Sequence, residues 1–250
     1  MSDAAPTAGA SAFDRSSSDD ALERLADAIR RITSISIGRP IPDREIDAAT
    51  GVLEGVASRL ESAAPLEKRP RRQPTPTTDP RQLFPTSPII GRSNPLAPPA
   101  RFWAAPGEDG TPELRGSVTF GYQYEGPPTC VHGGVIAELF DEMLGSANII
   151  ANHPAMTGTL TIRYRRVTPL HVPLDLAARC TGTERRKVFT WGGLYLNGEL
   201  TAEAEGIFIA THPGLMLDIV TANAEQAGVP VIDEGFIELV GEAASDPSHE

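Results

Sequence analysis

The sequence predicts an α+β fold in which an antiparallel sheet wraps around one long helix, with a helical hairpin as an N-terminal extension. Strand-like alternation of apolar and polar residues fills most of 101–212 and is interrupted by one apolar helical run after Gly134. Asn197-Gly198 separates the last two strand-like runs, which is a strong signal for an antiparallel hairpin. One helix cannot cover both faces of such a sheet. We therefore expect the sheet to curve around the helix, and dimerisation to extend the sheet or bury its edges.

Residues 19–62 have the pattern of two helices. Asp20 and Glu23 have the spacing of a capping box, and apolar residues follow at helical intervals. A second run after Pro42 carries a narrow apolar stripe formed by Ile46, Ala49, Leu53, Val56 and Leu60. Gly51 and Gly55 weaken this second helix, so it needs a partner surface. The hairpin is expected to pack either on the main domain or on a second subunit.

The remaining segments outside the main domain differ in composition. Residues 1–18 carry neither the basic nor the apolar region of a secretory signal, and a disordered N-terminus is expected. Residues 63–100 are proline-rich, which predicts an extended connector. From position 213 to 250 there are eight acidic residues and no Lys or Arg, which predicts a solvated acidic tail.

The composition of the chain excludes several classes of function. The 250-residue chain has a net charge of −11, which argues against nucleic acid as a general partner. No apolar run approaches the ~20 residues that span a bilayer. Two cysteines make neither a disulfide framework nor a metal site, and together with the missing signal they predict a protein of the reducing cytoplasm.

Six strand-like runs lie around the central helix. The first two, 101–106 and 113–124, flank the turn sequence "GEDGTP". After the helix come 155–166, 173–184, 187–196 and 200–212. The order is therefore two strands, a long helix and four antiparallel strands.

The stretch "VHGGVIAELFDEMLG" carries the chemistry of interest. Glycine at 133 and 134 lets a ligand approach the backbone where a helix begins. The free N–H groups and the positive dipole end of that helix can bind an anion or the oxygen of a carbonyl under attack. The plainer interpretation is a tight turn into a helix, with His132 hydrogen-bonded to nearby backbone.

A carboxylate, Asp141, stands in the middle of this helix. It belongs to a stripe that faces water, a cleft or a symmetry mate, made up of Gly134, Glu138, Asp141, Gly145 and Asn148. Gly134 and Asp141 lie about 10 Å apart along the axis, too far for one chain to bring both to one bond. A two-fold axis would bring Asp141 of one subunit beside Gly134 of the other. The spacing therefore favours a composite site at a dimer interface.

The same residues carry a family resemblance. "VHGGVIAELFDEMLG", preceded by "YEGPP" and followed by "AMTGTLTIRYRRVTPLHVPL", resembles the PaaI-like hotdog acyl-CoA thioesterases, and most closely the subgroup that contains the thioesterase superfamily members. The resemblance covers roughly residues 84–212, and because the strand pattern begins at Arg101 the hotdog domain is placed at 101–212. It implies a curved antiparallel sheet around one helix, dimers or dimers of dimers with sites between subunits, and hydrolysis of acyl-CoA to a free acid and CoA in lipid metabolism.

The resemblance also implies roles for individual residues. The N–H of Gly133 would be the oxyanion donor, and Asp141 of the partner subunit would be the general base or the nucleophile. Thr157 would position the attacking water, and His132 would orient the loop or contact the thioester oxygen. Some relatives have an Asn six residues before the His, where this chain has Gly126. Gly134 and Glu138 are candidate substrate contacts on the same helix face, although for Glu138 a solvated surface position is the simpler interpretation.

Acyl-CoA as a substrate implies cationic contacts with its phosphates. The candidates are Arg165 and Arg166, and in a second cluster Arg186 and Lys187; solubilising strand ends are an equally good interpretation of any one of them. No metal or organic cofactor is implied. Two other functions remain open: a non-catalytic acyl-CoA-binding or assembly module, and, with a poorer match, a hotdog dehydratase.

Overall fold

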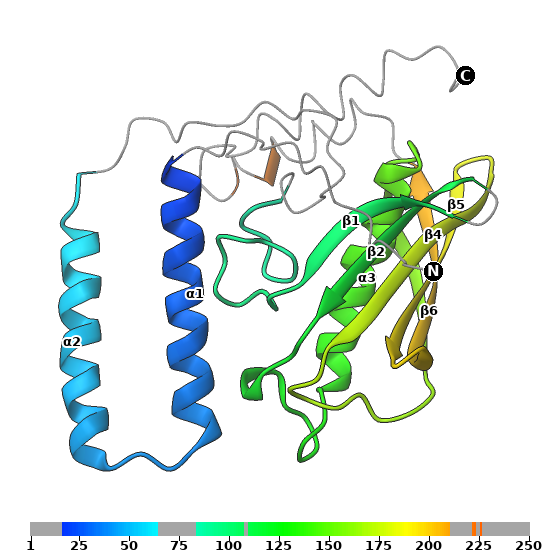
Figure 1. Ribbon diagram of the computed structural model, residues 1–250. Coiled ribbons are helices and arrows are strands. Elements are labelled where there is room, and N and C mark those ends of the chain that lie inside the picture. Colours follow the sequence, from blue (N-terminus) through cyan, green and yellow to red (C-terminus); the bar gives the residue numbers. More distant parts are fainter. Residues whose placement is uncertain (1–16, 65–83, 108–109, 211–221, 224–225, 227–250) are drawn as a thin grey trace, which may run out of the picture.

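The computed structural model describes residues 17–64, 84–107, 110–210, 222–223 and 226. Six strands form one antiparallel sheet that wraps around a single long helix, α3 (Gly133–Ile150) (Figure 1). The strands are β1 (Arg101–Pro106), β2 (Pro112–Val118), β3 (Ala155–Tyr164), β4 (Leu174–Glu184), β5 (Lys187–Leu196) and β6 (Glu199–Ala210). The predicted α+β fold is confirmed.

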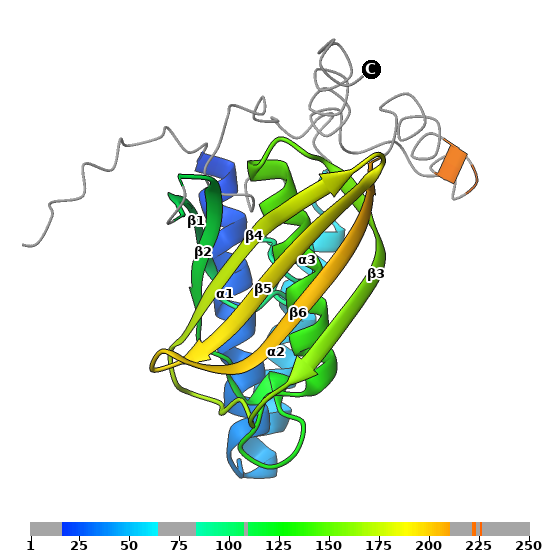
Figure 2. The same cartoon turned by 90° about the vertical axis from the view of Figure 1, so that its right-hand side faces the viewer.

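The strand order in the sheet is β1-β2-β4-β5-β6-β3, so β1 and β3 are its edges (Figure 2). The β5–β6 hairpin turns at Asn197 and Gly198, whose φ angles of 52° and 81° are those that a two-residue hairpin requires. β3 follows α3 directly in the chain and pairs with β6, the last strand. Its outer edge carries backbone groups without a neighbouring strand in the described part of the chain, so a second sheet can join at β3.

The core lies between α3 and the sheet. Leu139, Phe140 and Leu144 of α3 are at most 2% exposed, as the apolar face of this helix predicts. A Cβ on Gly192 of β5 or on Gly206 of β6 would come within 2.9 Å of the Leu144 side chain, so glycine at these positions lets helix and sheet approach closely.

The two N-terminal helices are α1 (Ser17–Gly38) and α2 (Asp43–Glu61). α1 packs on the main domain: Ala26 and Arg30 are buried, and Gly38 lies against the ring of Tyr122. α2 lies on the far side of α1 from the sheet and has no buried residue, so its apolar stripe, including Leu53, is exposed (Figure 1). The chain itself thus supplies a partner surface for α1, and whether α2 packs on a second subunit stays a prediction.

Two segments differ from the sequence-based expectation. The strand predicted over 113–124 ends at Val118, and a 3-10 turn, η2 (Tyr122–Tyr124), follows, because Tyr124 turns inward to become a buried core residue. The connector is not extended over its described part, 84–100. There it forms consecutive turns with Ile90 and Ala97 buried, because Ser87 and Asn94 bond to nearby backbone N–H groups.

The predicted disordered N-terminus and acidic tail lie outside the described residues, apart from positions 17, 18, 222, 223 and 226. Among the helices that the structure describes, none has the length and apolar character needed to cross a membrane.

Candidate active site

His132 is the N-cap of α3. Its Nδ1 accepts a 3.0 Å hydrogen bond from the N–H of Gly134, and its φ and ψ of −62° and 132° are the extended values usual for a cap. A ring nitrogen that accepts a hydrogen bond carries no proton, so in this arrangement the ring N–H is at Nε2. His132 therefore holds the turn in place, in line with the orienting role that the resemblance implies.

Gly133, the first residue of α3, presents the candidate oxyanion donor. Its carbonyl accepts a 2.8 Å hydrogen bond from the hydroxyl of Tyr164 on β3. Within the described residues its own N–H has no hydrogen-bond partner, and it lies at the positive end of the helix. Tyr164 was not among the predicted site residues, and its contact with Gly133 depends on a strand 31 positions later in the chain.

Asp141 and Thr157 meet across the gap between α3 and β3. The Thr157 hydroxyl donates a 2.7 Å hydrogen bond to Oδ1 of Asp141. Asp141 is half-buried and Thr157 is exposed, so the pair lies at the surface of this subunit. The structure thus brings together two of the predicted catalytic residues.

A bulge in β3 aims Thr157 at the helix. Counting back from Tyr164, alternate residues Ile162 and Leu160 face α3, and the next inward position would fall on Gly158. The register shifts between Thr157 and Thr159, so Thr157 pairs with the buried Phe208 in place of Gly158. Thr157 and Tyr164 therefore both point from one strand to α3, one toward Asp141 and the other toward Gly133.

Gly133 and Asp141 do not meet within one chain. They are eight residues apart on the same helix, which at 1.5 Å per residue separates them by about 12 Å along the axis. A general base has to lie near hydrogen-bond distance from the water that it activates. Within one chain these residues therefore form two separate clusters, Gly133 with Tyr164 and Asp141 with Thr157.

Close packing against the His132 turn explains why position 126 is a glycine in this chain. The N–H of Gly126 donates to the carbonyl of Cys130, and a Cβ at this position would lie 2.7 Å from Cα of His132. An Asn here, as in some relatives, would require the His132 turn to move.

Two further carboxylates lie on α3, Glu138 and Glu142, and they differ in burial and in contacts. Glu138 is exposed, in agreement with a solvated surface position. Glu142, which follows Asp141, accepts a 2.7 Å hydrogen bond from Ser87. Burial raises the pKa of Glu142, the Ser87 hydrogen bond lowers it, and the charge of Asp141 raises it further. No sequence signal links Glu142 to Ser87, which is 55 positions away.

The basic residues form two separate groups. Arg165 and Arg166 follow β3 and pair with Glu203 and Glu199 of β6. Lys187 begins β5 opposite Ile209, at the other end of the sheet from Tyr164, which pairs with Ala202. The guanidinium of Arg186, beside Lys187, donates to the Ala210 carbonyl. One subunit therefore does not gather all four cations around one ligand. In the described part of the chain no three His, Cys, Asp or Glu side chains are close enough to bind a metal ion.

A curved antiparallel sheet around one helix, with a His-Gly-Gly turn at its N-terminus, defines a protein of the hotdog-fold thioesterase class. No protein-family model matches the chain. The crystal structure of a thioesterase superfamily protein is 30% identical, with a TM-score of 0.64, and the match covers 82% of this chain and 93% of that one. The chain belongs to the thioesterase superfamily. The match is wider than residues 84–212, which are 129 of the 250 residues, so the similarity extends beyond the segment that carries the resemblance.

One curated relative is named an acyl-coenzyme A thioesterase, THEM4 of Xenopus laevis. It is 33% identical over 91 residues, which are 36% of this chain and 41% of the relative. The chain thus spans less than half of the length of this relative. The match to this relative is consistent with the PaaI-like subgroup to which the motif is similar.

Proposed function

We propose that the protein hydrolyses acyl-CoA thioesters to a free acid and CoA. The observation that carries the proposal is the pair of half-sites on α3: the N–H of Gly133 at the helix N-terminus, and Asp141 hydrogen-bonded to Thr157. The first can stabilise a developing oxyanion and the second can activate or replace water. Superfamily membership and the THEM4 relative support a thioester as the substrate.

The reaction needs one proton acceptor and one oxyanion donor. With Asp141 as general base, the carboxylate takes a proton from water while the water oxygen attacks the thioester carbon. The negative charge on the carbonyl oxygen is then held by the Gly133 N–H, and collapse of this intermediate breaks the C–S bond and releases the CoA thiolate, which takes up the proton. With Asp141 as nucleophile, its oxygen displaces the thiolate to give an anhydride, which water then hydrolyses.

A second copy of the chain would complete the site. Antiparallel pairing of two β3 edges across a two-fold axis can place Thr157 opposite Tyr164 of the partner subunit. Because Thr157 holds Asp141 and Tyr164 holds Gly133, this register would bring Asp141 of each subunit near Gly133 of the other. The same rotation would move Arg186 and Lys187 of the partner subunit toward Arg165 and Arg166, so that four cations would surround one CoA.

The first test is release of CoA from a panel of acyl-CoAs, from acetyl to palmitoyl and including aryl-acyl forms. Wild type should hydrolyse one class, and Asp141→Asn should lose about 100-fold or more in kcat, the scale of a general base. Glu54→Gln is the control, because this carboxylate on α2 is exposed and was not predicted to belong to the site. Binding of acyl-CoA without turnover by the wild type would instead favour the non-catalytic module and end the enzyme proposal.

The composite site has a separate test by subunit mixing. Gly133→Pro removes the N–H at the first helical position, where proline is tolerated, and the extended His132 backbone suits a following proline. Gly133→Pro and Asp141→Asn should each be inactive. After unfolding and refolding together, half of the dimers are mixed and half of the sites in those are intact, so about a quarter of the wild-type activity should return. No recovery, under conditions in which refolded wild type regains its activity, would contradict a site shared between two subunits.

A further inference from the structure

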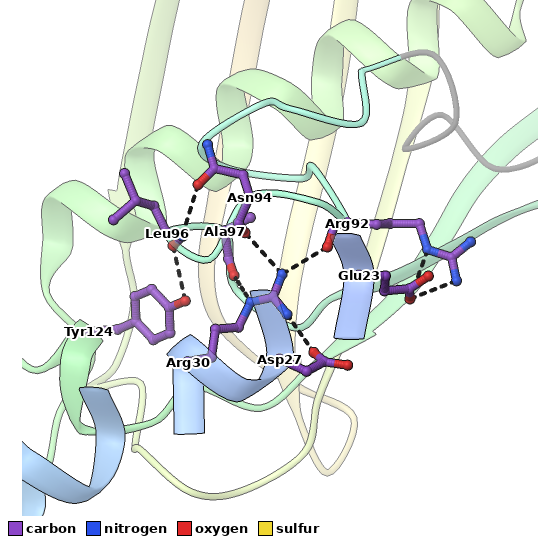
Figure 3. A network of polar contacts seen from close by, with 8 residues as sticks. All are labelled: Glu23, Asp27, Arg30, Arg92, Asn94, Leu96, Ala97 and Tyr124. Carbon is purple, nitrogen blue, oxygen red and sulfur yellow. Dashed lines mark hydrogen bonds and ion pairs between the residues drawn. The ribbon is translucent and has the colours of Figure 1, made fainter. Parts of the chain in front are cut away.

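Helix α1 is joined to the main domain by a buried arginine. Arg30 is 9% exposed, and its guanidinium donates to three backbone carbonyls of the 84–100 loop: Ala97 at 2.9 Å, Asn94 at 2.9 Å and Arg92 at 3.1 Å (Figure 3). Asp27, one turn earlier on α1, pairs with the same guanidinium. A buried charge is tolerated only when its donors are satisfied, so this loop and α1 fix each other's position.

A second ion pair holds the same two elements together. Arg92 donates to Glu23 of α1 at 2.9 Å (Figure 3). Both side chains of this pair are mostly buried, at 20% and 28% exposed. The 92–97 segment is therefore held by α1 through backbone and side chain alike.

The loop in turn holds Tyr124. The Tyr124 hydroxyl donates a 3.0 Å hydrogen bond to the Leu96 carbonyl, next to the Ala97 carbonyl that Arg30 binds (Figure 3). Tyr124 is 6% exposed, and burial raises its pKa to about 12, so the hydroxyl remains a donor over the working pH range. The ring also packs edge-on against Phe120.

The backbone of Tyr124 reaches the candidate active site. Its carbonyl accepts a 2.8 Å hydrogen bond from the N–H of His132, the N-cap whose next residue is Gly133. A continuous series of contacts thus runs from Arg30 through the Ala97–Leu96 backbone and Tyr124 to His132. The C-terminal end of α1 adds a parallel contact, since Gly38 lies against Tyr122.

We propose that Arg30 and Tyr124 are positioning residues, through which the N-terminal helix fixes the His132–Gly133 turn and so the direction of the Gly133 N–H. The catalytic meaning of this inference rests on the proposed function. It gives α1 a part in the site although no residue of α1 belongs to either half-site. The direction of the oxyanion donor affects the reaction rate, because a misplacement of about 1 Å lowers the rate on the order of 100-fold.

Two variants and one control test the proposal in the full-length protein. Tyr124→Phe removes only the hydroxyl, and Arg30→Met removes the donors while keeping an apolar side chain of similar length. Arg31→Met is the control, because Arg31 is the exposed neighbour on the same helix. We expect kcat to fall roughly 10-fold in both test variants with KM within about 2-fold, and no change in the control.

Amide hydrogen exchange provides a readout that needs no activity. The His132 N–H should exchange roughly 10-fold faster in both test variants, and the His153 N–H, bonded to Asn148 at the other end of α3, should keep its rate. Faster exchange of both amides would mean general destabilisation and would overturn the proposal. A Tyr124→Phe variant with the kcat of wild type and the His132 exchange rate of wild type would overturn it as well. An inactive wild type would refute the proposed function alone, since exchange at His132 still decides whether the turn is held.

Discussion

The hydroxyl of Thr157 lies 2.7 Å from Oδ1 of Asp141 and donates a hydrogen bond to it. The bond fixes one carboxylate oxygen and leaves the other for a water molecule or a thioester carbon. Thr157 reaches this position because of the bulge in β3. The bulge shifts the register, so that Thr157 and not Gly158 occupies the inward-facing position opposite Phe208. The arrangement suits Asp141 either as general base or as nucleophile.

Replacing Thr157 by valine should lower kcat roughly 10-fold, because the shape is kept while the orienting hydrogen bond is lost. KM should change little. Thr159→Val is the matched control, since Thr159 lies beyond the register shift and faces the other side of the sheet. Steady-state kinetics of the two variants would decide; equal losses in both would point to a general effect on β3 rather than to the contact with Asp141.

Tyr164→Phe should also impair turnover, by roughly 3- to 10-fold, since its hydroxyl holds the carbonyl of Gly133 and through it the peptide plane. Tyr195→Phe on β5 serves as the comparison. Its phenol has no hydrogen bond to the His-Gly-Gly turn in the described residues. If kcat is the same for Tyr164→Phe and wild type, the hydroxyl has no part in aiming the turn.

Replacing Arg186 and Lys187 together by alanine should raise KM for acyl-CoA by about 10-fold, because the proposed site places these two cations near the phosphates of CoA. Arg165→Ala should have a smaller effect, since this guanidinium is already paired with Glu203. The matching acyl-pantetheine, which lacks the nucleotide and its phosphates, is the control substrate. An equal rise in KM for both substrates would show that the cations do not bind the nucleotide end.

Stability should depend on pH through Glu142. Burial raises its pKa above the ordinary value of 4.5, so the folded protein holds this proton more tightly than the unfolded chain does. The contribution to the free energy of unfolding is therefore largest below that ordinary value and falls as pH rises through the raised pKa. Urea unfolding between about pH 4 and 7 should show this fall in wild type and a flatter profile in Glu142→Gln.

Glu138→Gln is the control for this profile, because it makes the same chemical change at an exposed position on the same helix. A Glu142→Gln slope identical to that of wild type would contradict the assignment. The amide oxygen introduced by Glu142→Gln can still accept the Ser87 hydrogen bond, so the comparison isolates the ionisation.

The sequence predicted most of the fold because its signals were local. Periodicity located all six strands and α3, and Asn197-Gly198 marked the hairpin that the structure confirms. The roles of Asp141, Gly133, His132 and Thr157 came from resemblance and remain predictions. What sequence patterns missed depends on long-range contacts: Tyr164 with Gly133, Ser87 with Glu142, and Arg30 with the 84–100 loop. The prolines of this loop predicted an extended connector. That prediction failed because composition does not reveal that a distant arginine binds the carbonyls of the loop.

Arg30 binds the loop only through main-chain oxygens, those of Arg92, Asn94 and Ala97. Every amino acid has a carbonyl, so these three bonds make no demand on the side chains at positions 92, 94 and 97, which are constrained only by contacts of their own. Arg30 has no such freedom, since no other residue presents its fork of donors. Variation among natural or engineered forms should therefore be tolerated at Leu96, whose side chain is 69% exposed and whose carbonyl alone binds Tyr124, and should spare the arginine that holds the loop.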